Sequence, residues 1–245
     1  MELWQGIFLA SAGVVAGFLN VMAGGGSLLI LPILVFMGLD GPFANGTNRV
    51  AIVAQNTTSV IGFFRKGYSD LRTSLTLSLC ALPGAALGAW LGTRVSGELF
   101  ERILGGIMLI LLVLMARKPK KKEVNEAQPQ RPLLGHLLMV GIGFYGGFIQ
   151  AGVGFLLMAV LYRAMGLDLV RVNMHKVFIV GVYTIVALAI FAAKGQVIWM
   201  TGLVLAVGNS IGGWIGTHYT VKKGERWIRI ILNVVLLVMA IRLLL

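Results

Sequence analysis

The stretch MAGGGSLLILPIL, residues 22–34, places three consecutive glycines inside a run of apolar residues. Each glycine costs about 1 kcal/mol relative to alanine in the interior of a helix. Glycine also permits positive φ and lets two backbone segments approach closely. The stretch therefore predicts a hydrophobic helix that ends just before Gly24 and a second helix that begins near Ser27.

The composition of the chain is typical of a helical membrane protein. Of its 245 residues, 58% are apolar and 12% are charged, and that charged fraction is about half of what a soluble domain carries. Long apolar runs recur along the whole length, which indicates several membrane-spanning helices. We expect residues 4–22 to be the first of them and not a removed signal peptide.

The sequence contains an internal duplication. Residues 23–29 recur at 151–157, with matching alanine, glycine and leucine positions, and the Met-Gly-Leu-Asp turn at 37–40 recurs at 165–168. Further along, GAWLGT at 88–93 matches GGWIGT at 212–217. Glycines, tryptophans and a turn in the same register favour two related halves over chance similarity of apolar segments.

Each half contains five apolar segments. The predicted organisation is a first transmembrane repeat at 1–117, a basic linker at 118–132 and a second transmembrane repeat at 133–245. Because five is odd, the second repeat should be inverted relative to the first. The segments lie at 4–22, 27–38, 46–64, 73–93 and 103–116, and at 133–149, 153–165, 174–193, 197–217 and 227–245.

The distribution of positive charge agrees with this inverted topology. With the linker placed inside, fifteen of the 21 Lys and Arg residues fall on the inner side and five on the outer side, with Lys176 near a helix start. Cytoplasmic loops of membrane proteins carry such an excess. We therefore expect a multi-pass protein of the plasma membrane with a cytoplasmic linker. The net charge of +12 then needs no nucleic-acid partner.

The second segment of each half is too short to cross a bilayer. About twelve helical residues reach about 18 Å, against a hydrocarbon core of about 30 Å. We expect each half to begin with a broken or re-entrant pair that turns within the membrane. The starts of the short helices would present backbone N–H donors to a buried anion from Gly24, Gly25, Gly26, Ser27, Gly152 and Gly154.

Glycines can also serve close helix packing in membranes. We favour that interpretation for Gly88, Gly92, Gly212 and Gly216, whereas we favour a binding site for the two clusters at the breaks.

Polar residues near the breaks complete the predicted site, since intramembrane polar groups are costly and mark function. Arg49 and Lys176 could neutralise an anion, with snorkelling to the membrane surface as the alternative for both. Asn45 and Asn173 are predicted helix N-caps, and Asp40 and Asp168 turn or cap residues. The side-chain candidates are Asn48, Arg49, Gln55, Gln150, His175 and Lys176.

The acidic residues restrict the mechanism. All nine fall in predicted loops or near segment ends, so the oxygen ligands that Na⁺ or a divalent metal needs are missing from mid-membrane. We expect neither a metal nor a cofactor. His175 is the plausible titrating group, so movement of the substrate would be proton-coupled through histidine or passive.

The glycine-rich runs AGGGSLLILP (23–32) and GGFIQAGVGFLL (146–157), the Gly-Leu-Asp turns and the GAWLGT and GGWIGT motifs resemble the TauE/SafE family of membrane transporters. The resemblance covers about residues 10–240. It implies a transporter that exports sulfite or a small organosulfonate, and by analogy alternating access with the site between the repeats. Its partners would be the lipid bilayer and a small anionic substrate.

Other functions stay open at this point. The substrate could be another small anion or sulfur compound, and a non-transporting scaffold would not explain paired breaks. A membrane-embedded enzyme would need a catalytic constellation, but His136, His175 and His218 are scattered, so we expect no enzyme. Trp90 and Trp214 could be interfacial anchors or contacts of a homodimer.

Overall fold

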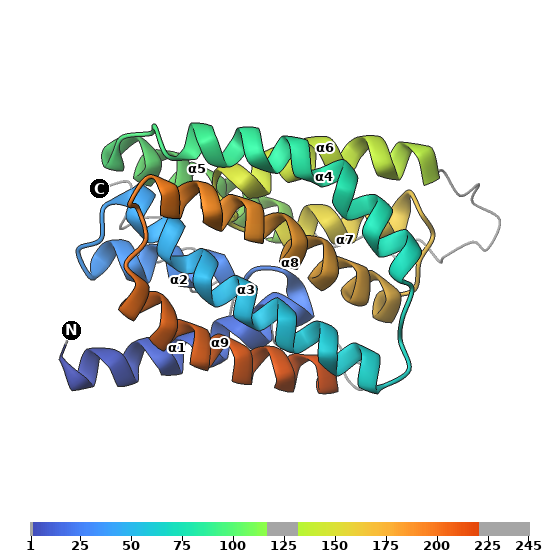
Figure 1. Cartoon of the computed structure of the whole chain (residues 1–245), viewed down its shortest axis with the longest axis horizontal. Coiled ribbons are helices and arrows are strands. Elements are labelled where there is room, and N and C mark those ends of the chain that lie inside the picture. The colour runs from blue at the N-terminus through green and yellow to red at the C-terminus, as the bar shows by residue number, and fades with distance from the viewer. Residues whose placement is uncertain (1, 117–131, 221–245) are drawn as a thin grey trace.

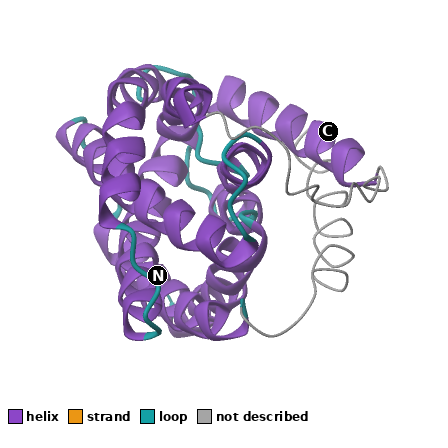
Figure 2. Cartoon of the chain, turned by 90° about the vertical axis from the view of Figure 1, so that its right-hand side faces the viewer, coloured by secondary structure: helices purple, strands orange, loops and turns teal. Residues whose placement is uncertain are grey.

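The computed structural model describes residues 2–116 and 132–220. The predicted linker and the last predicted segment, 227–245, lie outside the described residues. Within them the chain is helical, with short connections and no strand (Figures 1 and 2). The helices are α1 (Leu3–Ala23), α2 (Gly26–Phe36), α3 (Gly41–Arg65), α4 (Leu71–Gly92), α5 (Gly97–Ala116), α6 (Pro132–Phe148), α7 (Val153–Arg163), α8 (Leu169–Ala193) and α9 (Trp199–Tyr219).

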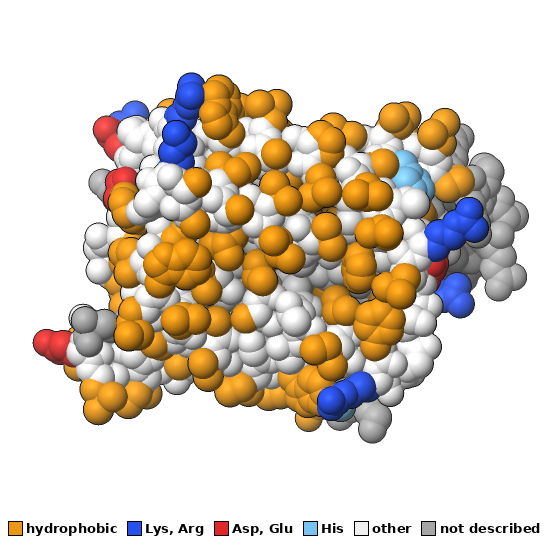
Figure 3. All heavy atoms as spheres, viewed as in Figure 1, with side chains coloured by type: hydrophobic (Ala, Val, Ile, Leu, Met, Phe, Trp, Pro, Cys, Tyr) orange, Lys and Arg blue, Asp and Glu red, His pale blue; other side chains and the backbone are white. Residues whose placement is uncertain are grey.

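Several described helices have the length and composition of membrane spans. Three of them, Leu3–Ala23, Leu71–Gly92 and Leu169–Ala193, are long and apolar enough to cross a bilayer. Hydrophobic side chains cover the middle of the face in Figure 3, and Lys and Arg lie toward its ends. The prediction of an all-α membrane protein is thereby confirmed. The division into domains and the orientation of each half in a bilayer stay predictions.

Both predicted breaks are present. Helices α2 and α7 have 11 residues each. Gly24 ends α1 with φ of +81°, and its N–H donates to the carbonyls of Leu19 and Asn20. Gly152 precedes α7 with φ of +68°. Left-handed residues end a helix because they turn the chain away from its axis, and glycine adopts this conformation without steric cost.

The helices that follow the two short helices begin five residues earlier than the segments predicted at 46–64 and 174–193. Helices α3 and α8 begin at Gly41 and Leu169, so Asp40 and Asp168 are the N-caps, which confirms their interpretation as cap residues. The prediction that Asn45 and Asn173 are N-caps was wrong, because both lie inside a helix. Gly41 and Pro42 in α3 and Arg171 in α8 interrupt the apolar pattern in these first turns.

Two helix pairs and two central helices make up the core of the described structure. Helix α1 packs along α9, and α4 packs along α6 (Figure 1). The central helices α3 and α8 contact each other, and α3 also contacts α9 while α8 contacts α4. This pattern is unchanged when the two halves of the duplication are exchanged, because α1 corresponds to α6 and α4 to α9. Each outer pair joins one helix from each half.

Glycines allow the helices of each pair to touch through their backbones. A Cβ atom on Gly88 would lie 2.0 Å from the carbonyl oxygen of Phe144, and one on Gly212 would lie 2.0 Å from that of Val14. Gly92 and Gly216 face Phe148 and Phe18 in the same pairs. The packing interpretation of these four glycines is confirmed, and it follows the small-residue pattern of membrane helices.

Candidate functional site

The two breaks meet each other at the centre of the described structure. A Cβ atom on Gly24 would lie 2.5 Å from the backbone of Gly154, and one on Gly154 would lie 2.2 Å from the Cα of Gly24. Only glycine on both sides allows this approach. The sequence predicted two halves of one site at these positions, and the structure brings them into backbone contact.

The N-termini of two short helices therefore start close to one point. Helix α2 begins at Gly26, after the N-cap Gly25, and α7 begins at Val153, after Gly152. The first amides of a helix have no intrahelical acceptor, and the helix dipole places partial positive charge there. Ser27 is buried in the first turn of α2. The contact thus combines two sets of donors that suit an anion.

Arg49 and Lys176 bind the carbonyl ends of the opposite half's broken helix. Arg49 of α3 donates to the carbonyls of Gly146 (3.2 Å) and Gly147, at the end of α6. Lys176 of α8 donates to the carbonyl of Val21 at the end of α1, at 2.7 Å. These carbonyls lack helical partners and carry the negative end of the dipole, so both cations stabilise the breaks.

Each cation is also held by an asparagine from its own helix. Arg49 donates to Oδ1 of Asn45 at 3.2 Å, and Lys176 donates to Oδ1 of Asn173 at 2.6 Å. Since Asn45 and Asn173 are equivalent in the duplication, the two arrangements are related. The exposed fractions of Arg49 and Lys176 are 0% and 2%, so the alternative of snorkelling to the surface is wrong.

A group of neutral polar side chains lies beside the first break. Gln55 Oε1 accepts hydrogen bonds from Nδ2 of Asn20, at 3.1 Å, and of Asn209, at 3.5 Å. Ser59 lies one turn further along α3, and Gly213 of α9 packs against both Gln55 and Ser59. We call these four polar residues, Asn20, Gln55, Ser59 and Asn209, the amide cluster.

Several atoms of this region are buried without a hydrogen-bond partner among the described residues. They are Nε2 of Gln55, Oγ of Ser59, Oδ1 of Asn209 and both polar atoms of Asn48. Asn48, Gln55 and Ser59 are seven and four residues apart, so they share one face of α3. Each unpaired buried group costs about 1–3 kcal/mol, which makes these atoms candidates to bind a polar solute or water.

The second break has its own polar arrangement. Gln150 has φ of +65°, a conformation that is unfavourable for residues with a Cβ atom. Its Oε1 accepts a hydrogen bond from the hydroxyl of Tyr183 at 3.1 Å, and the Tyr145 hydroxyl donates to the carbonyl of Ala151. A strained, buried amide at a break is a feature found at functional sites.

The structure brings most, but not all, of the predicted residues together. His175 points to Ser74 of α4 instead of toward a break. The sequence did not predict a place in the site for Ser59, Tyr183 or Asn209. Asn209 carried a usable signal, because it is a polar residue within an otherwise apolar segment. Within the described residues no cluster of His, Cys, Asp or Glu has a metal-binding arrangement.

These features define a helical membrane protein built around two broken helices that meet in its interior, an arrangement found in secondary transporters. The model of the sulfite exporter TauE/SafE family matches residues 9–243. The chain belongs to this family.

Curated relatives carry names that agree with this class. A "probable membrane transporter protein ORF9" from Sinorhizobium sp is 29% identical over 97% of this chain and 91% of the relative. The "probable membrane transporter protein YfcA" of Escherichia coli K12 is 27% identical over 100% of this chain and 94% of the relative. No solved structure matches the chain. The family and these names support a function in membrane transport.

Proposed function

We propose that the protein transports small anions, sulfite or a small organosulfonate, outward across the plasma membrane. The backbone contact between Gly24 and Gly154 carries the proposal, because it directs two helix N-termini at one place inside the protein. Because the family consists of transporters, we propose transport and not an enzymatic reaction. The direction and the sulfur substrate follow from the family's description as sulfite exporters.

In this mechanism the anion binds where the halves meet. Backbone amides of Gly25, Gly26, Ser27, Gly152 and Gly154 surround its oxygens, and Asn48, Gln55 and Gln150 donate from their side chains. The predicted amide of Gly24 is not among these donors, because it already donates to the carbonyls of Leu19 and Asn20. Neutral donors at helix N-termini suit a small oxyanion. Arg49 and Lys176 hold the helix ends and supply the positive field.

We propose that transport follows alternating access. The Gly24–Gly154 contact is closed backbone to backbone, so the anion needs the halves to separate there. Hydrogen bonds between halves, from Arg49 and Lys176, would break and reform during this motion. Another small anion or sulfur compound is the alternative cargo, and the same site would serve it.

Efflux from proteoliposomes tests this function. Vesicles loaded with radiolabelled sulfite or methanesulfonate should release the label faster with the protein than without it. Gln55→Leu should slow release at least tenfold, since it removes the Nε2 donor. Thr57→Val, on an exposed position of the same helix, should leave release unchanged. Equal release from protein-free vesicles would contradict the proposed function.

A further inference from the structure

A second polar arrangement lies away from the breaks, between the N-terminal ends of α4 and α8. His175 is fully buried, and its Nδ1 lies 2.8 Å from Oγ of Ser74. Its Nε2 has no hydrogen-bond partner among the described residues and lies 3.9 Å from Oδ2 of Asp70. In the tautomer whose Nδ1–H donates to Oγ of Ser74, Nε2 carries the lone pair and is the nitrogen that can bind a proton.

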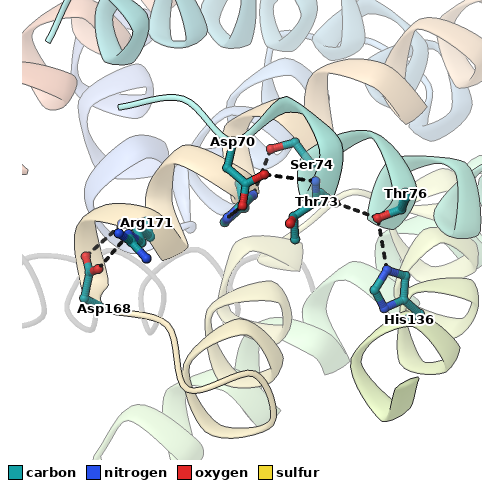
Figure 4. A network of polar contacts seen from close by, with 8 residues as sticks. Asp70, Thr73, Ser74, Thr76, His136, Asp168 and Arg171 are labelled. Atoms are coloured by element: carbon teal, nitrogen blue, oxygen red, sulfur yellow. Dashed lines mark hydrogen bonds and ion pairs between the residues drawn. The ribbon is translucent and has the colours of Figure 1, made fainter. Parts of the chain in front are cut away.

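Asp70 connects this histidine to the water at that end of the molecule. Its carboxylate accepts the backbone N–H of Thr73 and so caps α4 (Figure 4). Its side chain stays 46% exposed. A small hollow lies beside it, lined by Asp70 and Ser74 together with the aromatic residues Phe64 and Tyr68. A proton from the water can therefore approach Nε2 past Asp70.

The charged groups that face His175 come from two places. Asp70, from the connection between α3 and α4, and Asp168, on its own helix, attract a positive charge, while Arg171 repels it. From α4 the facing polar group is Ser74. Asp70 itself is ionised: desolvation raises its pKa, but the hydrogen bonds from Thr73 and the charges of His175 and Arg171 lower it more.

His175 is adjacent in sequence to a contact that holds the first break. Lys176 donates to the carbonyl of Val21 and so joins α8 to the end of α1. A positive charge on His175 would be drawn toward Asp70 and repelled by Lys176. Proton binding at His175 would thus act on the start of α8, and through Lys176 on the helix end beside Gly24.

We infer that His175, paired with Asp70, is a proton-binding site that couples proton movement to anion transport. The inference rests on the proposed function. The proton comes from water on the side of Asp70 and adds to the lone pair of Nε2, which forms an imidazolium whose new N–H faces the carboxylate. No other bond is made or broken, and release to water reverses the step.

The test uses proteoliposomes with a trapped pH indicator and a gradient of methanesulfonate, an anion that carries no proton in the neutral range. With the wild type, methanesulfonate entry should be accompanied by a change in internal pH. His175→Gln should lose at least nine-tenths of the pH signal per anion moved. Exchange of labelled methanesulfonate at equal pH should persist. His136→Gln, on a half-buried residue of α6 that lies outside the proposed site, should keep both signals.

A second variant removes the charge but keeps the helix cap. Asparagine caps helices as well as aspartate does, so Asp70→Asn should fold normally and weaken the pH signal. A pH signal that persists in full in His175→Gln would overturn the inference.

If the wild type moves no anion, the proposed function fails, and proton binding is then measured directly by NMR of histidine-labelled protein in detergent. The imidazole signal that disappears in His175→Gln should shift as the pH is lowered below neutral. A signal that does not respond to pH would overturn the inference.

Discussion

At the scale of residues, Arg49 and Lys176 do the same work from opposite halves. Each residue lies in the first turns of a central helix and donates a hydrogen bond to an asparagine of its own helix. Each also donates to carbonyls at the end of the other half's broken helix. A buried cation is tolerated where it meets such carbonyls. Sequence alone suggested cations near an anion, and the structure adds that they hold the breaks together.

Lys176→Met tests this stabilising role. Methionine keeps much of the volume but leaves the carbonyl of Val21 and Oδ1 of Asn173 without their donor, at a cost of about 1–3 kcal/mol. We expect a clearly lower melting temperature in detergent. Lys194→Met, at an exposed position after α8, should not change it. Equal melting temperatures for both variants would contradict the role of Lys176.

Replacement of Gln150 by glycine should keep or raise the stability of the protein and slow its transport. Glycine adopts a φ of +65° without strain, so Gln150→Gly should relieve about 1–2 kcal/mol of backbone strain. The loss of the hydrogen bond from Tyr183, about 1 kcal/mol, offsets part of this gain. We expect an unchanged or higher melting temperature together with slower efflux. Wild-type efflux would mean that the side chain has no part in the site.

At the scale of elements, glycine decides how the helices pair. The α4–α6 and α1–α9 pairs place glycines against backbone carbonyls, so each pair is closer than side chains would permit. The break at Gly24 and Gly154 uses the same property for a different purpose. There the glycines interrupt the helix and let the two halves touch.

Two glycines of α6 provide a matched test of pairing. A Cβ atom on Gly143 would lie 2.1 Å from the carbonyl oxygen of Ala81, whereas one on Gly141 meets no atom within 4 Å. Gly143→Ala should therefore cost about 1–3 kcal/mol, and Gly141→Ala should add about 0.5–1 kcal/mol of stability. Thermal unfolding in detergent would measure both. A stable Gly143→Ala variant would contradict the packing account.

The elements were largely predictable from the sequence, and their contacts were not. The glycine runs at 24–26 and 152–154 predicted the breaks because helix propensity is a local property. Helix starts at Gly41 and Leu169 were missed, since glycine, proline and arginine interrupt the apolar pattern in the first turns that Asp40 and Asp168 cap. Contacts such as Arg49 with Gly146 join residues far apart in the chain, and no local pattern encodes them.

At the scale of the whole molecule, helices of one half pack along helices of the other half. Helix α1 lies with α9, and α6 lies with α4, so neither half forms its pairs alone (Figure 1). Motion of one half must therefore move part of the other.

Orientation in the membrane is tested with single cysteines in a Cys80→Ala background. Glu126→Cys lies in the predicted cytoplasmic linker, and Glu98→Cys lies at the exposed start of α5, on the predicted outer side. In intact cells an impermeant maleimide should label only the second variant. Labelling of the linker variant from outside would contradict the predicted topology.

The central claim is that the anion binds where the two breaks meet, and protection of Ser27→Cys from alkylation measures this most directly. Ser27 lies in the first turn of α2, beside the contact, and native Cys80, replaced by alanine in this variant, serves as the control thiol in the wild type. We predict that methanesulfonate slows N-ethylmaleimide labelling of the new thiol at least threefold and leaves Cys80 labelling unchanged. Labelling at the same rate with and without methanesulfonate, in a protein that transports it, would place the site elsewhere.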